Sequence, residues 1–184
     1  MTQADQLRDT IEEAVRLGDT PSVVERIKRE LSDRIRAGKV KLEPRFYRTR
    51  ADTYARRLLY RDPELGYTAV VMTWGPGQQT AVHDHAGIWC VEGVVEGEMD
   101  VIRYELEREE GGLFRFRAWE AAHASVGSAG CLIPPFEHHV LKNAAASPSI
   151  TLHVYGGEIS RCHVYLPRSD GWYERQVRSL GYDD

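Results

Sequence analysis

The sequence has few cysteines, no long apolar run and no concentrated block of basic charge. Only three of its 184 residues are cysteines, and Cys90, Cys131 and Cys162 are too widely spaced to suggest a disulfide framework. No run approaches the roughly 18 to 20 apolar residues that cross a bilayer, and residues 1–9 lack the apolar core of a secretory signal. These absences predict a cytoplasmic protein with free thiols and no membrane segment.

Charge and size narrow the range of partners further. The formal net charge is -4 and no dense cluster of lysine or arginine occurs, which gives no electrostatic reason to bind nucleic acid. The chain is 42% hydrophobic and 28% charged, as in an ordinary globular protein, and its length suits one domain with a short appendage. The oligomeric state is left open between a monomer and a small homo-oligomer.

Residues 3 to about 38 have the spacing of two amphipathic helices. Thr20 and Pro21 offer an N-cap and a first helical position for the second helix. We therefore expect residues 1–41 to form a helical extension that packs on the rest of the chain. The apolar positions that carry this periodicity recur every three or four residues, at Leu7, Ile11, Val15, Val24, Ile27, Leu31 and Ile35.

From Leu42 onward, short runs typical of strands alternate with Gly, Pro and Asn. Their close spacing favours antiparallel hairpins, and residues 107–112 read as an exposed charged hairpin loop. We expect residues 42–184 to form a mainly β domain, either a barrel or a sandwich. The predicted strands are 67–74, 89–95, 99–105, 113–118, 130–133, 139–142, 150–155 and 162–166.

Two histidines separated by one residue are the first candidates for a metal site. His83, Asp84 and His85 lie in a segment that reads as a strand, so alternation points both imidazoles to one face and Asp84 away. Such a pair alone is weak evidence, because any strand that bears histidines can produce it. The residues around the pair strengthen the prediction.

The spacing around the pair resembles the first cupin motif. Five residues separate Gly77 from His83, four separate His85 from Cys90, and six separate Cys90 from Gly97. The motif has a Glu ligand where this chain has Cys90. The site would then offer neutral imidazoles without a carboxylate, which suits an anionic thiolate as a further ligand and leaves iron, copper, nickel or zinc as candidates.

A second segment resembles the other cupin motif. Pro134 precedes His139, and three residues separate His139 from Asn143, although Phe136 replaces the Gly of the motif. Strand alternation allows only one of His138 and His139 to face a metal, and the spacing to Asn143 favours His139. Together the two motifs resemble the cupin superfamily over residues 70–145. The resemblance implies a double-stranded β-helix barrel, or jelly roll, with a metal held by His83, His85 and His139.

Further matches resemble the type I cysteine dioxygenase family over residues 42–166. In that family a Cys at the spacing of Cys90 is joined by a thioether to a Tyr, and Tyr155 stands at the matching position. The segment that carries Thr151, His153 and Tyr155 is similar to the family's Ser-Leu-His-x-Tyr, and alternation places these three side chains on one strand face.

The same resemblance implies a binder for the substrate carboxylate. Tyr54 and Arg56 match a Tyr-x-Arg motif whose Arg grips the carboxylate, with Arg57 as the alternative. Cys162 and His163 match a Cys-His dipeptide of the family, to which we assign no catalytic role. His123 lies in a polar segment that reads as a solvated loop.

Two departures from the family pattern concern the substrate. Thr151 replaces the usual Ser and keeps its hydroxyl, whereas the ending Tyr155-Gly156-Gly157 is similar to that of bacterial mercaptopropionate dioxygenases. Those relatives typically have Gly at the position of Cys90 and Gln at that of Arg56. Cys90 and Arg56 therefore favour cysteine.

The resemblance implies an iron(II) enzyme of cysteine catabolism that oxidises L-cysteine with O2 to cysteine sulfinic acid. Arg56 and Tyr155 would hold the substrate carboxylate. Two alternatives stay open: the same chemistry on 3-mercaptopropionate or another small thiol, and a non-catalytic cupin that binds a metal or a small ligand.

Overall fold

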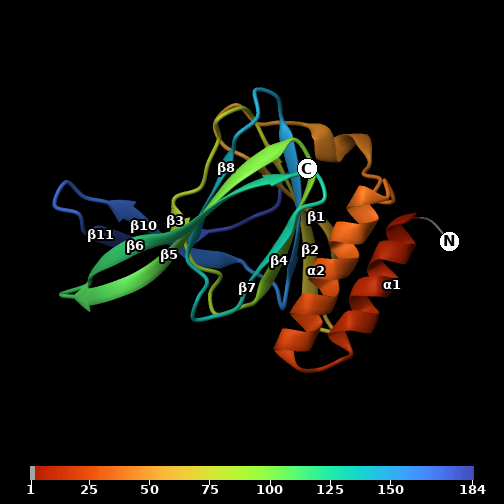
Figure 1. Ribbon diagram of the computed structural model, residues 1–184, viewed down its shortest axis with the longest axis horizontal. Coiled ribbons are helices and arrows are strands. Elements are labelled where there is room, and N and C mark those ends of the chain that lie inside the picture. The colour runs from red at the N-terminus through yellow and green to blue at the C-terminus, as the bar shows by residue number, and fades with distance from the viewer. Residues whose placement is uncertain (1–2) are drawn as a thin grey trace.

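The computed structural model describes residues 3–184 and shows two helices packed against one side of a β-barrel (Figure 1). The helices are α1 (Gln3–Val15) and α2 (Thr20–Arg36), followed by the short 3-10 helix η1 (Pro44–Tyr47). The strands are β1 (Ala55–Asp62), β2 (Tyr67–Trp74), β3 (Val82–His83), β4 (Cys90–Glu96), β5 (Glu98–Glu110), β6 (Leu113–Ser125), β7 (Ala129–Leu132), β8 (His139–Asn143), β9 (Ser149–Tyr155), β10 (Arg161–Pro167) and β11 (Tyr173–Ser179). The prediction of a mainly β fold with an N-terminal helical extension is confirmed.

The strands form two antiparallel layers. One sheet has the order β1-β2-β9-β4-β7, and the other closes as β10-β11-β6-β5-β8-β3. The long β5–β6 hairpin and the β10–β11 pair extend away from the helices as an arm (Figure 1). This is the double-stranded β-helix arrangement expected of a cupin.

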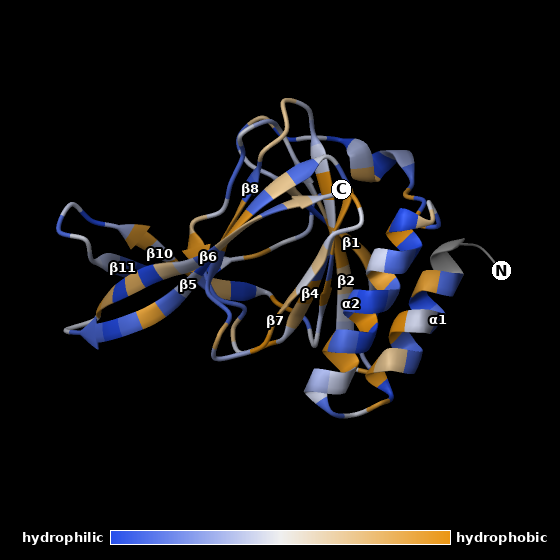
Figure 2. Ribbon diagram, in the orientation of Figure 1, coloured by the Kyte–Doolittle hydropathy of each residue, from blue (hydrophilic) through white to orange (hydrophobic). Residues whose placement is uncertain are grey.

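Strands β2 and β9 are buried along their whole length because both of their faces are covered. Val71 and Leu152 face the helices and join a core with Val24 and Leu31. Val70, by contrast, faces the barrel interior. The apolar stripes of the two helices lie toward the sheet, which is why an amphipathic pattern suffices to dock them (Figure 2).

The second helix begins one residue earlier than the sequence suggested. Asp19, rather than Thr20, is the N-cap, and its side chain accepts a hydrogen bond of 2.9 Å from the Ser22 N–H. Thr20 lies within the first turn, beside Pro21. Over residues 3–184, no helix combines the length and the apolarity that crossing a bilayer requires.

Several strands were not predicted, or have other bounds than predicted, because apolar and polar residues do not alternate along them. β11 is exposed almost throughout and was not predicted, and β1 was missed because its sequence is rich in arginine. The β5–β6 hairpin closes at Gly111–Gly112, so the loop predicted at 107–112 is mostly strand. His123 lies in β6 rather than in a loop, although it is exposed as expected.

Gly97 of the first cupin motif and Asn143 of the second stabilise the contacts between neighbouring strands at one end of the barrel. Gly97 has φ +76° at the β4–β5 turn, and a Cβ there would lie 2.9 Å from the Ser149 backbone. Asn143 donates hydrogen bonds to the carbonyls of Trp74 and Gly75 at 3.1 and 3.0 Å, and it accepts one of 2.7 Å from the Ser149 hydroxyl. These contacts tie β8 and β9 to the loop that leads to the histidine pair.

Candidate metal centre

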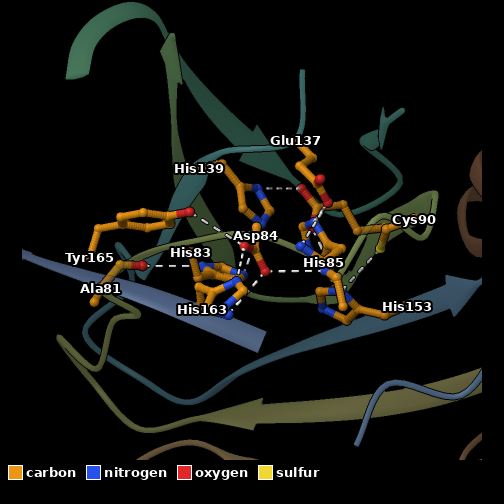
Figure 3. A network of polar contacts seen from close by, with 12 residues as sticks. Ala81, His83, Asp84, His85, Cys90, Glu137, His139, His153, His163 and Tyr165 are labelled. Carbon is orange, nitrogen blue, oxygen red and sulfur yellow. Dashed lines mark hydrogen bonds and ion pairs between the residues drawn. The ribbon is translucent and has the colours of Figure 1, made fainter. Parts of the chain in front are cut away.

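Three imidazoles converge at one end of the barrel (Figure 3). His83 ends β3 and pairs in register with His139, the first residue of β8. His85 lies just beyond β3, so the predicted strand ends before the second histidine of the pair. One ligand atom from each of the three residues lies within 4.8 Å of the others.

The spacing of these imidazoles fits a shared metal ion. His83 Nε2 and His139 Nε2 are 3.2 Å apart. Two nitrogens bound to one metal at about 2.1 Å would be roughly 3.0–3.4 Å apart for bond angles of about 90–109°. The Nδ1 of His83 lies 3.1 Å from the Ala81 carbonyl, which can only accept, so the proton is on Nδ1 and the Nε2 lone pair is free.

Burial keeps the three imidazoles neutral at physiological pH. It lowers the pKa of His83 to about 4. Burial, followed by the repulsion between neighbouring histidines, lowers the pKa values of His85 and His139 well below the usual range. A neutral imidazole is the form that binds a metal, so the site does not need to release protons to accept one.

Asp84 turns away from the other two residues of the His-Asp-His segment and anchors that segment to β10 (Figure 3). Its carboxylate accepts hydrogen bonds from the His163 Nδ1–H at 2.7 Å, the His163 backbone N–H at 3.0 Å and the Ala86 N–H at 3.1 Å. Although burial alone would raise the pKa of Asp84, these hydrogen bonds hold it below its ordinary value. His163, for which the sequence predicts no catalytic role, thus helps to hold the segment that carries His83 and His85.

A second polar group lies beside the imidazole cluster on the inner face of β9. Trp74 Nε1–H donates to Thr151 Oγ1 at 2.9 Å, and Thr151 Oγ1 lies 2.8 Å from His153 Nε2. The ring of His153 stacks on that of Tyr155 with centroids 6.0 Å apart. Burial, followed by the nearby positive charge of Arg56, lowers the pKa of His153 to about 3.

Cys90 and Tyr155 are directly opposite one another on β4 and β9. Opposed residues of an antiparallel pair have Cβ atoms about 4.5–5.5 Å apart, which brings these two side chains together. Burial raises the pKa of both groups well above the usual ranges, so the thiol and the phenol are neutral. The structure therefore brings together the two residues that the resemblance pairs.

Arg56 projects into the same space as the imidazoles. A narrow hollow of about 30 Å³ is lined by Arg56, His83, His85 and Tyr155, among others. The guanidinium donates to the carbonyls of Gly181 at 3.1 Å and Ile159 at 3.2 Å, which leaves three of its five N–H groups for a ligand.

The side chains of Arg57 and His138, which the sequence left open as alternatives to Arg56 and His139, make other contacts. Arg57 lies on the opposite face of β1, where its Nε donates to the Asp184 carbonyl at 3.0 Å. His138 packs against the rings of Phe116 and Tyr165, with centroids 5.0 and 5.3 Å away. Arg57 does not line the hollow, and the imidazole that clusters with His83 and His85 is that of His139 rather than that of His138.

Two charged residues near the site were missed by the sequence reasoning. Arg178 lines the hollow from β11, a polar strand that carries no apolar signal. Glu92 lies between His139 and His153, and burial raises its pKa to about 7. A signal for Glu92 was present in the sequence, since it is the only charged residue in the apolar run 90–95.

The barrel topology and the converging imidazoles define a metal-binding cupin. The family described as Cysteine dioxygenase type I matches residues 42–168, and the chain belongs to this family. The protein is accordingly a cupin-type metal-dependent dioxygenase.

Solved structures give more distant likenesses. A protein of Thermus thermophilus is 25% identical, with 63% of this chain and 94% of that chain covered and a TM-score of 0.49. An uncharacterized conserved protein with a double-stranded beta-helix domain from Klebsiella pneumoniae is 20% identical, with 65% and 91% covered and a TM-score of 0.48. The cupin domain of a Schizosaccharomyces pombe protein is 10% identical, with 66% and 72% covered and a TM-score of 0.45.

The anchor formed by Asp84 leads to a prediction about stability and pH. Replacing Asp84 with Asn should lower the free energy of unfolding by about 2 kcal/mol at pH 7, because hydrogen bonds to a buried charge are lost. Since the folded pKa lies below the ordinary 3.8, this contribution is complete above that value and is lost as the pH falls through the folded pKa. Urea unfolding of both proteins from pH 7 to pH 3 measures the difference.

Asp100→Asn is the matched control for this experiment. Asp100 also pairs with a histidine, His123 Nδ1 at 2.8 Å, but both side chains are about half exposed, at 45% and 56%. The control should leave stability nearly unchanged. Equal effects of the two substitutions, or an Asp84→Asn deficit that persists at low pH, would contradict the anchoring role.

Proposed function

We propose that this protein is a thiol dioxygenase that uses O2 to convert L-cysteine to cysteine sulfinic acid, with iron(II) held by His83, His85 and His139. The observation that carries the proposal is the shared hollow, which the buried Arg56 lines together with His83 and His85. A substrate with a thiol at one end and a carboxylate at the other matches the two ends of this hollow.

The residues of the chain bind and orient the substrate, while bound iron would supply the redox chemistry with dioxygen. Arg56 offers a planar fork to the carboxylate, and the neutral Tyr155 hydroxyl can donate a further hydrogen bond to it. The small volume of the hollow excludes bulk water and large substrates. Because both ends of a short substrate would be held, its sulfur would lie at the imidazole cluster. Such positioning lowers the activation free energy of the oxidation.

Cys90 and Tyr155 are proposed to become linked by a thioether. Their opposed positions in the β4–β9 pair support this, as does the burial that keeps both groups neutral until they are oxidised. The link would remove the Cys90 thiol as a competing ligand and hold the phenol beside the substrate.

The glycine ending after Tyr155 has a packing explanation that does not involve the substrate. A Cβ on Gly156 would lie 2.2 Å from the indole Nε1 of Trp89, so the ring requires Gly there. The likeness of Gly156 to the mercaptopropionate dioxygenases is therefore weak support for 3-mercaptopropionate as the substrate. Arg56, which favours cysteine, becomes the main evidence on substrate choice.

We also propose a cytoplasmic location. Cys90, Cys131 and Cys162 are all free thiols, and Cys90 and Cys162 are buried. A reducing compartment suits such a set.

The first prediction of this proposal concerns substrate choice. Iron-loaded protein should consume O2 with L-cysteine and release cysteine sulfinic acid, with a kcat/KM at least about 10-fold above that for 3-mercaptopropionate, because cysteine carries an amine that can serve as a second ligand beside its thiolate. An oxygen electrode and product identification by mass spectrometry across a panel of thiols give the answer. A preference for 3-mercaptopropionate would shift the assignment to that substrate, and no uptake with any thiol would favour a non-catalytic cupin.

A second prediction separates Arg56 from Arg57. Arg56→Ala should lower kcat/KM for cysteine about 100-fold through loss of a charge-assisted carboxylate contact, with a much smaller effect on cysteamine, which lacks the carboxylate. Arg57→Ala is the matched control, since it removes a buried guanidinium from the other face of the same strand. Equal losses on both substrates for Arg56→Ala would count against carboxylate binding.

A third prediction concerns the covalent link. Digests of active protein should contain a joined peptide pair from around Cys90 and Tyr155, about 2 Da lighter than the sum of its parts because two hydrogens are lost on oxidation. The pair should be absent from Cys90→Ser and present in Cys131→Ser. Mass spectrometry that finds only free Cys90 in active enzyme removes the link from the mechanism.

A further inference from the structure

Glu92 is a carboxylate inside the barrel that the proposed function has not yet used. It lies on β4 two residues after Cys90, so both side chains share the inner face of that strand. Its partner in register across β9 is His153. The side chain is only 12% exposed, which requires an explanation because an isolated buried charge is costly.

The two carboxylate oxygens of Glu92 each face a different imidazole. Oε1 lies 3.7 Å from His139 Nδ1, and Oε2 lies 3.6 Å from His153 Nδ1. Among residues 3–184, His139 Nδ1 and Glu92 Oε2 have no hydrogen-bond partner. Both separations exceed a hydrogen bond by about half an ångström, a gap that a small rotation of the carboxylate closes.

The proton of a metal-bound His139 must lie on the side of Glu92. His139 Nε2 faces His83 Nε2 at 3.2 Å and is the atom placed for the metal. A neutral imidazole that binds through Nε2 carries its proton on Nδ1. That N–H then points at Glu92 Oε1. In many metal sites a carboxylate accepts this second N–H of a histidine ligand and so fixes the orientation of the ring.

Thr151 also bears on the proton of His153. Its Oγ1 accepts the Trp74 indole N–H and lies 2.8 Å from His153 Nε2. We assign the hydroxyl hydrogen of Thr151 to this second contact, so that His153 Nε2 accepts and the His153 proton is on Nδ1. The Nδ1 atom lies 3.6 Å from Glu92 Oε2 and 4.0 Å from Cys90 Sγ.

The cation that acts on Glu92 is already engaged by other groups. Arg103 lines the same cavity as Glu92, a space of about 280 Å³ that is separate from the substrate hollow. Its guanidinium, however, donates to the Cys131 carbonyl at 2.9 Å and lies 3.4 Å from the Glu120 carboxylate. Arg103 thus has two other partners, whereas the Nδ1 atoms of His139 and His153 lie 3.7 and 3.6 Å from the Glu92 carboxylate.

We propose that Glu92 is a positioning residue that accepts the Nδ1 protons of His139 and His153 and so fixes the orientation of a metal ligand and of the Thr151–His153 pair together. The inference rests on the metal site of the proposed function and extends it. In its ionised form Glu92 would lie 3.7 Å from His139 and would partly offset the charge of a bound metal, for which other cupins supply a Glu ligand at the position of Cys90. Glu92 does not touch the substrate hollow, so its effect passes through the two imidazoles.

The test uses the full chain, labelled with 15N-histidine and loaded with Zn(II) as a diamagnetic probe, so that it does not depend on turnover. Wild-type spectra should show His153 in its Nδ1–H form and two slowly exchanging, downfield Nδ1 protons, from His139 and His153. Glu92→Gln keeps one acceptor oxygen and should lose one of these protons, and Glu92→Leu should lose both. Zn(II) affinity, measured by chelator competition, should fall about 10-fold or more in both variants.

Glu120→Gln is the matched control, because Glu120 lines the same cavity without facing an imidazole. It should leave the spectra and the affinity unchanged. The inference would be overturned if the Nδ1 protons were unshifted in both Glu92 variants. It would also be overturned if His153 were protonated at Nε2 in the wild type, a result that does not depend on whether either variant folds. Failure of the wild type to bind Zn(II) would overturn the metal site, and with it the inference, whereas binding without thiol oxidation would overturn only the proposed reaction.

Discussion

The pairing register of β4 with β9 is the constraint on which the rest of the site depends. It places Cys90 opposite Tyr155 and Glu92 opposite His153. A slip of one residue would turn every one of these side chains to the outer face. The outer face holds the register in place, because Val91, Leu152 and Val154 pack in the helix-covered core. The N-terminal helices therefore stabilise the chemistry indirectly, by fixing which residues point inward.

The fold was predictable where burial leaves a periodic signal in the sequence. β2 and β9 are covered on both faces and match the predicted runs closely, whereas β1 and β11 are rich in polar residues and were missed. The clustering of His83, His85 and His139 was predictable from motif spacing. Arg178 was not, since it is a polar residue on an exposed strand that only long-range pairing brings to the hollow. Glu92 had a sequence signal, but its partners are set by the three-dimensional arrangement.

The site is made mostly of groups that burial keeps neutral, with a few charges in fixed places. The metal ligands, His153, the Cys90 thiol and the Tyr155 phenol are uncharged at physiological pH for this reason. Arg56 and Arg178 line the hollow together with His83 and His85, whereas Glu92, whose pKa burial raises to about 7, lines a separate cavity. The two guanidinium groups make the hollow positive and favour a ligand that carries an anionic group.

The side chain of Arg56 is held by parts of the chain that do not contribute to the imidazole cluster. Arg56 donates to the carbonyls of Ile159 and Gly181, its backbone N–H donates to Asp183 at 2.8 Å, and its guanidinium lies 4.6 Å from the Tyr182 ring centre. The last three of these partners lie beyond residues 42–168, the part that matches the family. The metal ligands, by contrast, all lie within it. The segment 181–183, outside the matched region, thus helps to set the position of the Arg56 guanidinium, whereas the imidazole cluster is built within that region alone.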